Sequence, residues 1–241
     1  MTENEAERQA PPITAHADPE GAAPWAMQMV VHAPKSSPPG HTFTLEAAAA
    51  ATVQLLHHVE VNNDPGEVAA VQRWLQGRIR KVVRRARGAS WDRAVEQAHT
   101  VTSVGDATVA AWLPAPTDQV PATLAKLQVS GLELTDDGHD LGAAFPDGRV
   151  AVYLNPAVTL STGKAAAQVS HAAQLVFQSS TGQGREAWAR AGAPVTVTTP
   201  TPQVWDELLT RAQISITDAG FTEIAPGTRT CVAVHPFATL P

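Results

Sequence analysis

The chain has 241 residues, of which 44% are hydrophobic, and a formal net charge of −6. This length can bury one large core or two small ones. No apolar run approaches the length of a transmembrane helix, and the single cysteine, Cys231, excludes an internal disulfide. We therefore expect a cytoplasmic protein without a membrane partner, in which Cys231 is a small core residue and not a nucleophile.

The acidic charge is concentrated in the first part of the chain. Residues 1–148 hold 11 Lys/Arg and 18 Asp/Glu, whereas residues 149–241 hold 6 and 5. The net charge argues weakly against a nucleic-acid partner, but the later part is near neutral. Residues 1–24 are acidic and rich in Pro and Ala, and they lack the basic and apolar regions of a signal peptide. We expect them to form a disordered tail.

The elements expected after the tail alternate strands with helices and turns. In chain order they are a strand at 28–31, a helix at 45–58 with Thr44 as N-cap, a turn at 62–66, a long helix at 67–86, a helix at 91–98, a strand at 107–113, a helix at 120–128 and a turn at 136–138.

The second half is expected to repeat this order. Its elements are a strand at 150–154, a loop at 156–163, a helix at 164–177, a loop at 181–184, a strand at 195–198, a helix at 204–212, an apolar segment at 214–216 with a turn at 218–220, and a strand at 231–234. The alternation predicts an α/β protein with a mixed sheet of about four strands and flanking helices.

Two segments suggest an internal duplication. LELTDDG (132–138) resembles ISITDAG (214–220), and each precedes an apolar strand that ends in proline. We therefore expect two related lobes, at 25–148 and 149–241. The strand at 150–154 fits either as the last strand of the first copy or as the first strand of the second.

The segment STGKAAAQVSHAA (161–173) carries candidate chemistry. Lys164, Gln168 and His171 lie at i, i+4 and i+7 and share one helix face. A lysine at a helix N-terminus adds a full charge to the exposed N–H groups, which suits a phosphate or a developing oxyanion. The alternative is a solvated lysine, a surface glutamine and a half-buried histidine.

The segment ITDAGFTEIAPGTRT (216–230) places Asp218 at a strand end with several threonines nearby. The turn at Pro226-Gly227 should bring residues 228–230 close to Asp218. An acid, hydroxyl groups and a lysine at one sheet edge could orient a water molecule. The alternative is that Asp218 only forms a turn.

Together, GKAAAQVSHAA and DAGFTEIAPGTRT resemble the two signature segments of the archaeal/eukaryotic-type (type II) peptidyl-tRNA hydrolases, and the resemblance covers about residues 149–241. It implies hydrolysis of the ester bond in peptidyl-tRNA, without a metal or another cofactor. By position, Lys164 would contact the scissile ester or terminal phosphate, His171 matches the family's helix histidine, Asp218 would orient or activate water, and Thr222 and Thr230 match the hydroxyls beside it.

The sequence departs from the family pattern at several positions. Ser161-Thr162 replaces a second Gly-Lys pair, and Asn155-Pro156-Ala157 stands where an acidic residue is common. Phe221 replaces a basic residue, and Glu223 replaces a polar one. These changes remove positive charge where tRNA would approach, so they affect affinity more than chemistry.

The first half departs much further, because its helix LEAAAAATVQLL has no lysine at its start. We expect this copy to be catalytically empty. Family members commonly form dimers. Our hypothesis is therefore that the degenerate copy takes the place of a second subunit in a pseudo-dimeric monomer; otherwise a homodimer is expected.

The stretch RIRKVVRRAR (78–87) is expected to be a basic amphipathic helix inserted in the first lobe. It could be a solvated helix face, contact a phosphate backbone or lie on a membrane surface. The resemblance favours phosphate contact. The expected tRNA-binding residues are Lys164, Arg78, Lys81, Arg84, Arg85 and Arg229. Adjacent histidines at 57 and 58 point in different directions on a helix, so no metal site is expected there.

The expected function is hydrolysis of peptidyl or N-blocked aminoacyl-tRNA by the lobe at 149–241. One alternative is a non-catalytic tRNA-binding or interaction module that retains the fold. Another is a hydrolase of some other small ester or amide that uses the same scaffold.

Overall fold

The computed structural model describes residues 22–137, 149–218 and 224–239. The expected tail therefore lies outside the described residues, except for its last three. Thr222, Phe221 and Glu223 also lie outside them, as do most of the residues that join the two halves.

The first half forms a mixed sheet with helices packed on it. Its elements are β1 (Trp25–His32), α1 (His41–Asn62), α2 (Pro65–Leu75), β2 (Lys81–Ala86), α3 (Ala89–Val95), β3 (Thr100–Val104), β4 (Ala107–Ala111), β5 (Ala115–Pro116) and α4 (Ala122–Ala125). The strands lie in the order β2-β1-β4-β3, and β5 pairs with one end of β1. Strand β1 is parallel to β2 and antiparallel to β4.

The second half forms another mixed sheet. Its elements are β6 (Val150–Leu154), α5 (Thr162–Ser179), β7 (Ser180–Thr181), α6 (Gly182–Arg190), β8 (Val195–Thr198), α7 (Pro202–Arg211), β9 (Ile214–Thr217), β10 (Arg229–Val234) and β11 (Ala238–Thr239). The sheet order is β8-β6-β10-β9, with β6 parallel to β8 and antiparallel to β10. The mixed α/β class expected from the sequence is confirmed.

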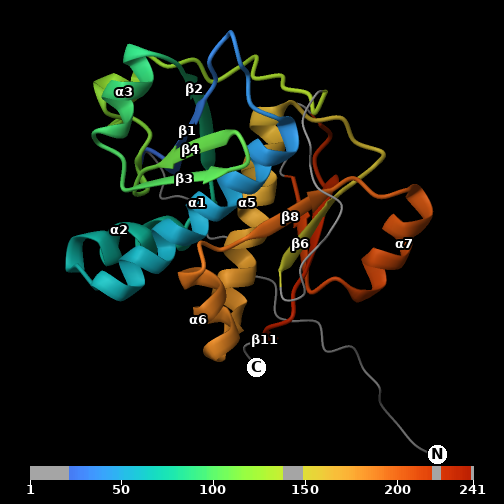
Figure 1. Ribbon diagram of the computed structural model, residues 1–241. Helices are drawn as coiled ribbons and strands as arrows, with labels where there is room; N and C mark the ends of the chain where they lie inside the picture. The colour runs from blue at the N-terminus through green and yellow to red at the C-terminus, as the bar shows by residue number, and fades with distance from the viewer. Residues whose placement is uncertain (1–21, 138–148, 219–223, 240–241) are drawn as a thin grey trace, which may run out of the picture.

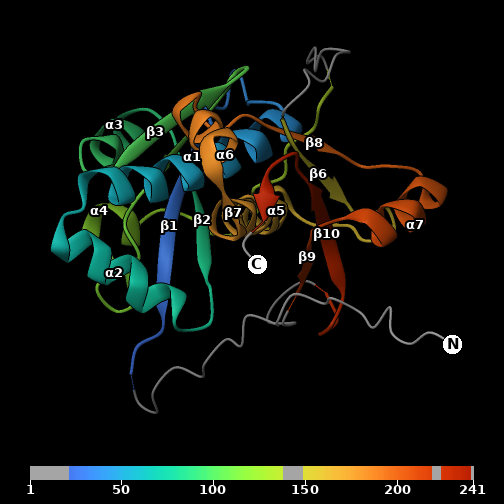
Figure 2. The same cartoon turned by 90° about the horizontal axis from the view of Figure 1, so that it is seen from below.

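The two sheets share one topology. In each, the first strand is followed by a long helix and a parallel neighbour, and the last two strands form an antiparallel pair beside the first strand. Helices α1 and α5 pack against each other between the sheets (Figure 1), and Figure 2 shows α5 end-on in this position. Each helix also contacts the other half, because α1 packs on β8 and α5 packs on β2.

A single hydrophobic core joins the halves. It includes Met27 and Met29 of β1, Val150 and Val152 of β6, and the apolar faces of both long helices. Alanines fill much of the contact, at 47–51 in α1 and at 165, 166, 172 and 173 in α5. Small side chains let the helix backbones approach closely, so the two halves bury each other's apolar faces.

A side chain of α1 also closes the edge of the second sheet. Strand β8 is the edge strand opposite β9, and the backbone N–H of Val197 in β8 donates to Oε1 of Glu46 at 3.0 Å. Burial raises the pKa of Glu46, while this hydrogen bond opposes the rise. The contact satisfies an edge N–H group that the sheet itself leaves without a partner.

The long helix expected at 67–86 is wrong in its second part. Helix α2 ends at Leu75, and Lys81–Ala86 is strand β2, so there is no basic helical insertion. The β-branched Val82 and Val83 suit an extended strand, and pairing with β1 outweighs the local helix pattern. The expected loop at 181–184 also proves to be the start of helix α6.

The duplication match between 132–138 and 214–220 is also corrected. Residues 132–134 form no strand, and β3, which was not expected, is the positional counterpart of β9 in the sheet order. The strand at 150–154 is resolved as β6, which lies inside the second sheet between β8 and β10.

The segment around residue 134 instead binds the starts of both long helices. Asp136 accepts hydrogen bonds from the backbone N and Oγ1 of Thr42, both at 2.8 Å. Leu132 accepts from the N–H of Thr162 at 3.0 Å. Helix α1 begins after Gly40 and not after Thr44, whose hydroxyl donates back to the Gly40 carbonyl.

Candidate active site

The first turn of α5 positions a lysine at the edge of the second sheet. Ser161 is the N-cap, and its Oγ accepts a hydrogen bond from the backbone N of Lys164 at 3.2 Å. One turn later Gln168 lies on the same helix face. Both side chains reach Asp218, which directly follows β9, the outer strand of this sheet.

These residues form one connected network. Nζ of Lys164 lies 2.5 Å from Oδ1 of Asp218, and Nε2 of Gln168 donates to the same oxygen at 2.9 Å. Oγ1 of Thr230 in β10 donates to Oε1 of Gln168 at 2.9 Å. Asp218 is only 6% exposed and Thr230 is fully buried, whereas the Lys164 side chain is 15% exposed. The network therefore reaches the surface at its lysine.

The backbone around Asp218 is held in place from both sides. Its N–H donates to the carbonyl of Thr228, and its carbonyl accepts from the N–H of Gly227, both at 2.9 Å. Gly227 has a φ of 80°, which glycine adopts without steric cost. The expected approach of residues 228–230 to Asp218 is confirmed, and the carboxylate has a fixed position.

The network combines a buried carboxylate with an ammonium group at a helix N-terminus. A carboxylate can accept a proton from water, and an ammonium can stabilise an oxyanion. Among the residues that the structure describes, no group of three or more His, Cys, Asp or Glu side chains could hold a metal ion. The arrangement thus offers acid–base and electrostatic chemistry from its own side chains.

His171 lies farther along α5 and faces the other half. Burial, together with the smaller effect of the Lys81 charge on β2, lowers its pKa to about 3. Lys81 donates to Oε1 of Gln174 at 2.5 Å and lies over the ring of Trp74 at 5.0 Å. Within the described ranges, no hydrogen bond joins His171 to the Lys164–Asp218 network. Its catalytic role stays a prediction.

Sequence reasoning placed Gln168 on the correct helix face but gave it no role. The structure shows that it connects Thr230 to Asp218. Because the Asp218 carboxylate can only accept, the Gln168 amide presents its NH₂ to Asp218 and its Oε1 to the Thr230 hydroxyl. The signal in the sequence was that Gln168 follows Lys164 by four residues, which places both on one helix face.

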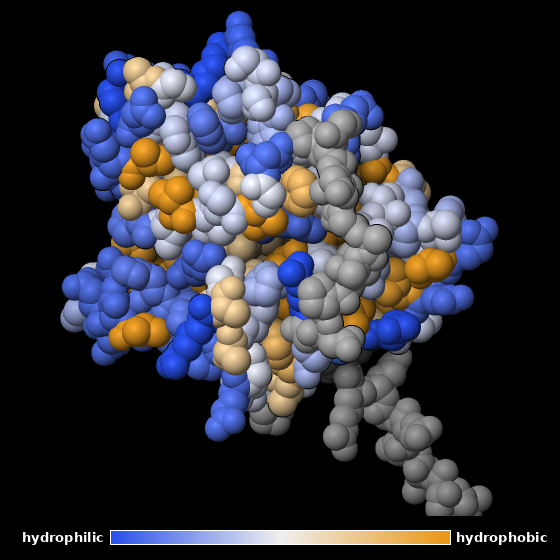
Figure 3. Space-filling model, viewed as in Figure 1, coloured by the Kyte–Doolittle hydropathy of each residue, from blue (hydrophilic) through white to orange (hydrophobic). Residues whose placement is uncertain are grey.

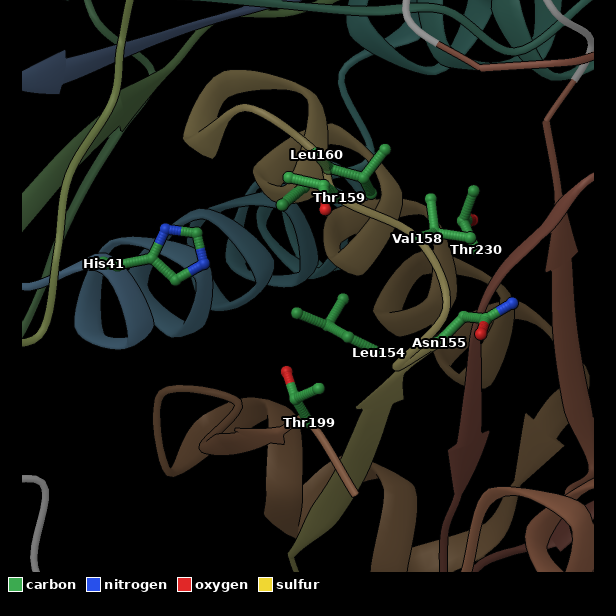
Figure 4. A pocket seen from close by; sticks show the side chains of 9 residues that line it. His41, Leu154, Asn155, Val158, Thr159, Leu160, Thr199 and Thr230 are labelled. Carbon is green, nitrogen blue, oxygen red and sulfur yellow. The ribbon is translucent and has the colours of Figure 1, made fainter. Parts of the chain in front are cut away.

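A pocket of about 210 Å³ lies next to the network, at the carboxyl ends of β6 and β8 (Figure 4). Thr230 borders it, and so does Ala165, the residue after Lys164. His41 of α1 also lines it, so the first half contributes a side chain to this region. No sequence pattern pointed to His41, because its position depends on how the halves pack.

The expected tRNA-binding residues have different surroundings. Arg84 donates to Oε1 of Gln28 and the carbonyl of Leu127, and Arg85 donates to the carbonyl of Gly131 and Oε1 of Gln128. These two arginines therefore bind the segment that follows α4.

The other expected contacts differ in exposure. Arg78 and Arg229 are exposed, whereas Lys81 contacts α5. No helix among the described residues is long and apolar enough to cross a membrane. On the face shown in Figure 3, apolar side chains stand among polar ones.

The region that contains the network is similar to a known family. Residues 149–239 match the model of the family described as peptidyl-tRNA hydrolase PTH2. The chain is 38% identical over 87 residues to peptidyl-tRNA hydrolase 2, mitochondrial, from Bos taurus, which covers 32% of this chain and 49% of that protein. The chain thus spans about half the length of this relative. The matched region, which contains Lys164, Gln168, Asp218 and Thr230, is similar to this family.

Proposed function

We propose that this protein hydrolyses the ester bond between a peptidyl or N-blocked aminoacyl group and tRNA. The observation that carries the proposal is the buried network of Lys164, Asp218, Gln168 and Thr230, which lies within the region that matches the family. It combines a proton acceptor with an oxyanion-stabilising cation at one end of α5.

Each side chain has a role in this mechanism. The Asp218 carboxylate orients a water molecule and accepts its proton as the water attacks the ester carbonyl. The Lys164 ammonium leaves its ion pair to stabilise the oxyanion that develops on the carbonyl oxygen. The intermediate then collapses, the bond from the carbonyl carbon to the ribose oxygen of the tRNA breaks, and the proton taken up by Asp218 passes to that oxygen. Gln168 holds the carboxylate, and Thr230 fixes the direction of the Gln168 amide. No step requires a metal ion.

Positive charge would hold the tRNA. Of the expected residues, Lys164 belongs to the network and the exposed Arg229 directly precedes Thr230, while Arg78 is exposed on the first lobe; exposed guanidinium groups can reach phosphates. Arg84, Arg85 and Lys81 already donate to protein oxygens, so phosphate contact would require them to exchange partners.

We also propose that the two lobes are related copies and that the first takes the place of a second subunit. The shared strand order and the reciprocal contacts of α1 with β8 and α5 with β2 support this. The chain should then be a monomer of 25.3 kDa in solution. A light-scattering mass of twice that value would contradict the proposal.

Ester hydrolysis is tested by the release of N-acetylated amino acid from charged tRNA. The wild-type protein should turn over this substrate, and Asp218→Asn should not, because the amide cannot accept the proton of water. Asp206→Asn, an exposed aspartate on α7, is the matched control.

Two other results would favour the alternatives. An inactive wild type that retains salt-sensitive tRNA binding would favour a tRNA-binding module, which the loss of basic residues at 161–162 supports. Turnover of simple esters without tRNA would favour another hydrolase. We keep the cytoplasm as the proposed location, and cell fractionation tests it.

A further inference from the structure

The pocket beside the network is uncharged and half apolar. The residues that line it are His41, Leu154, Asn155, Val158, Thr159, Leu160, Ala165, Thr199 and Thr230. Among these described residues there is no acid, lysine or arginine. Thr230 belongs both to this lining and to the network, so the pocket adjoins the network.

The orientation of His41 is set by its contact with the other lobe. Its Nδ1 lies 2.9 Å from Oγ1 of Thr162, which accepts a hydrogen bond from the N–H of Leu134 at 2.9 Å. If the Thr162 hydroxyl donates to Nδ1, the Leu134 N–H, the Thr162 hydroxyl and the His41 Nδ1 are all paired, and the ring proton lies on Nε2. Figure 4 shows the His41 ring extending toward the space that Leu154 and Thr199 border.

The ring is a neutral donor near pH 7. Burial lowers the pKa of His41, and the charges of Asp136 and Glu133 oppose the shift without reversing it. A neutral N–H group suits a carbonyl oxygen, whereas phosphate sites use cations or helix N–H groups. Among the described residues that line this pocket there is no Trp, Tyr or Phe, on which bases commonly stack.

We propose that this pocket binds the amino-acid residue that is esterified to the tRNA. The side chain of that residue packs on Leu154, Val158 and Leu160, and the Nε2–H of His41 donates to the carbonyl of the amide that blocks its amino group. His41 is then a specificity residue that the first lobe supplies to the active site of the second. The inference rests on the proposed hydrolase function. A free α-ammonium group would lack this acceptor and would bring a charge into an uncharged pocket, so unblocked aminoacyl-tRNA would react more slowly.

The test compares N-acetyl-aminoacyl-tRNA with unblocked aminoacyl-tRNA that carries the same amino acid. His41→Phe keeps a ring of similar size and removes the donor. It should lower kcat/KM for the N-acetyl substrate by about fivefold to tenfold, as expected for one hydrogen bond, and change the unblocked substrate much less. His58→Ala, an exposed histidine on the same helix, is the control and should leave the ratio unchanged.

A second variant tests the pocket without His41. Val158→Phe should narrow it and lower kcat/KM for N-acetyl-leucyl-tRNA more than for N-acetyl-glycyl-tRNA. Thermal melting of each variant shows whether it remains folded.

The outcomes separate this inference from the proposed function. An active wild type and an inactive Asp218→Asn, with an unchanged substrate ratio in His41→Phe, would overturn the pocket assignment and leave the hydrolase intact. Equal losses on both substrates would also overturn it, because they point to binding of the tRNA terminus. A wild type without turnover would overturn both.

Discussion

The two lobes have the same strand order but different side chains where the long helix begins. Counted from the N-caps Gly40 and Ser161, Phe43 stands at the position of Lys164. By the same count Ala47 replaces Gln168. The first lobe therefore has apolar residues where the second has its lysine and glutamine.

The strand register extends the comparison to the carboxylate. Val109 pairs with both Val31 and Thr102, as Cys231 pairs with both Leu154 and Ile216. Val104 lies two residues after Thr102 in the first lobe, and Asp218 lies two residues after Ile216 in the second.

The next residue of the first lobe, Gly105, explains how that lobe fills the space. A Cβ atom on Gly105 would lie 2.6 Å from the ring of Phe43, so the ring rests directly on the glycine backbone. Gly105 also has a φ of 54°, which disfavours other residues. The fold does not need the ion pair, because an aromatic ring can occupy its place. We therefore propose that the buried charges of the second lobe serve the reaction and not the fold.

Removing the lysine should have the largest effect. Lys164→Ala should lower kcat for N-acetyl-aminoacyl-tRNA about 100-fold to 1,000-fold, the loss typical of one oxyanion-stabilising group. Phe43→Leu at the matching position should leave kcat close to that of the wild type. Single-turnover hydrolysis checks both, and similar losses in the two variants would refute the difference between the lobes.

Breaking the middle of the network should have a smaller effect. Gln168→Leu removes the donor to Asp218 and leaves the Thr230 hydroxyl with the Ile216 carbonyl as its acceptor, so kcat should fall about tenfold. In a double-mutant cycle with Thr230→Val, the second change should add little, because both act through the same amide. Fully additive losses would show that Gln168 and Thr230 act independently.

Acid should destabilise the contact between the lobes through His171. Its folded pKa of about 3 lies below its ordinary value of 6.5, so the unfolded chain binds the proton first as pH falls. The stability present above pH 6.5 should therefore decrease toward pH 3, by at most about 1.4 kcal/mol per pH unit.

The variant His171→Leu should lack this contribution to the pH dependence. Urea unfolding at pH 7 and pH 5 measures the difference in the free energy of unfolding. In His58→Leu, at an exposed position on α1, the free energy of unfolding should change between pH 7 and pH 5 as it does in the wild type. An identical change in His171→Leu would show that His171 titrates normally in the folded protein.

The smallest effect concerns Cys231. Burial raises the pKa of its thiol to about 12, so the thiolate is scarce at pH 8. Iodoacetamide should label the native protein slowly and the urea-unfolded protein quickly, as mass spectrometry can show. Rapid labelling of the native protein would place Cys231 at the surface.

The sequence was sufficient to predict most of the second half and two separate parts of its network. Lys164 and Asp218 lie in segments with strong local signals, a helix start and a strand-end turn, and the structure brings them together. Thr222 lies outside the described residues. The role of Gln168 needed coordinates, because helix spacing shows a shared face but not a partner across the sheet.

The first half was predicted less well because its packing outweighs local preference. Residues 78–87 have a helix-like pattern, yet pairing with β1 makes 81–86 a strand. The segment at 132–138 resembled a repeated strand but binds the starts of α1 and α5. The contribution of His41 could not be predicted, since it depends on a contact between residues 121 positions apart.

The hydrogen bond from Val197 to Glu46 has a consequence for any attempt to shorten the chain. Without α1, strand β8 would expose a row of backbone donors and acceptors, and the alanine face of α5 would be open to water. Such an edge recruits other strands. An isolated 149–241 fragment should therefore self-associate. In the whole chain the first lobe covers this edge, and we propose that this cover keeps the second lobe from pairing with another copy.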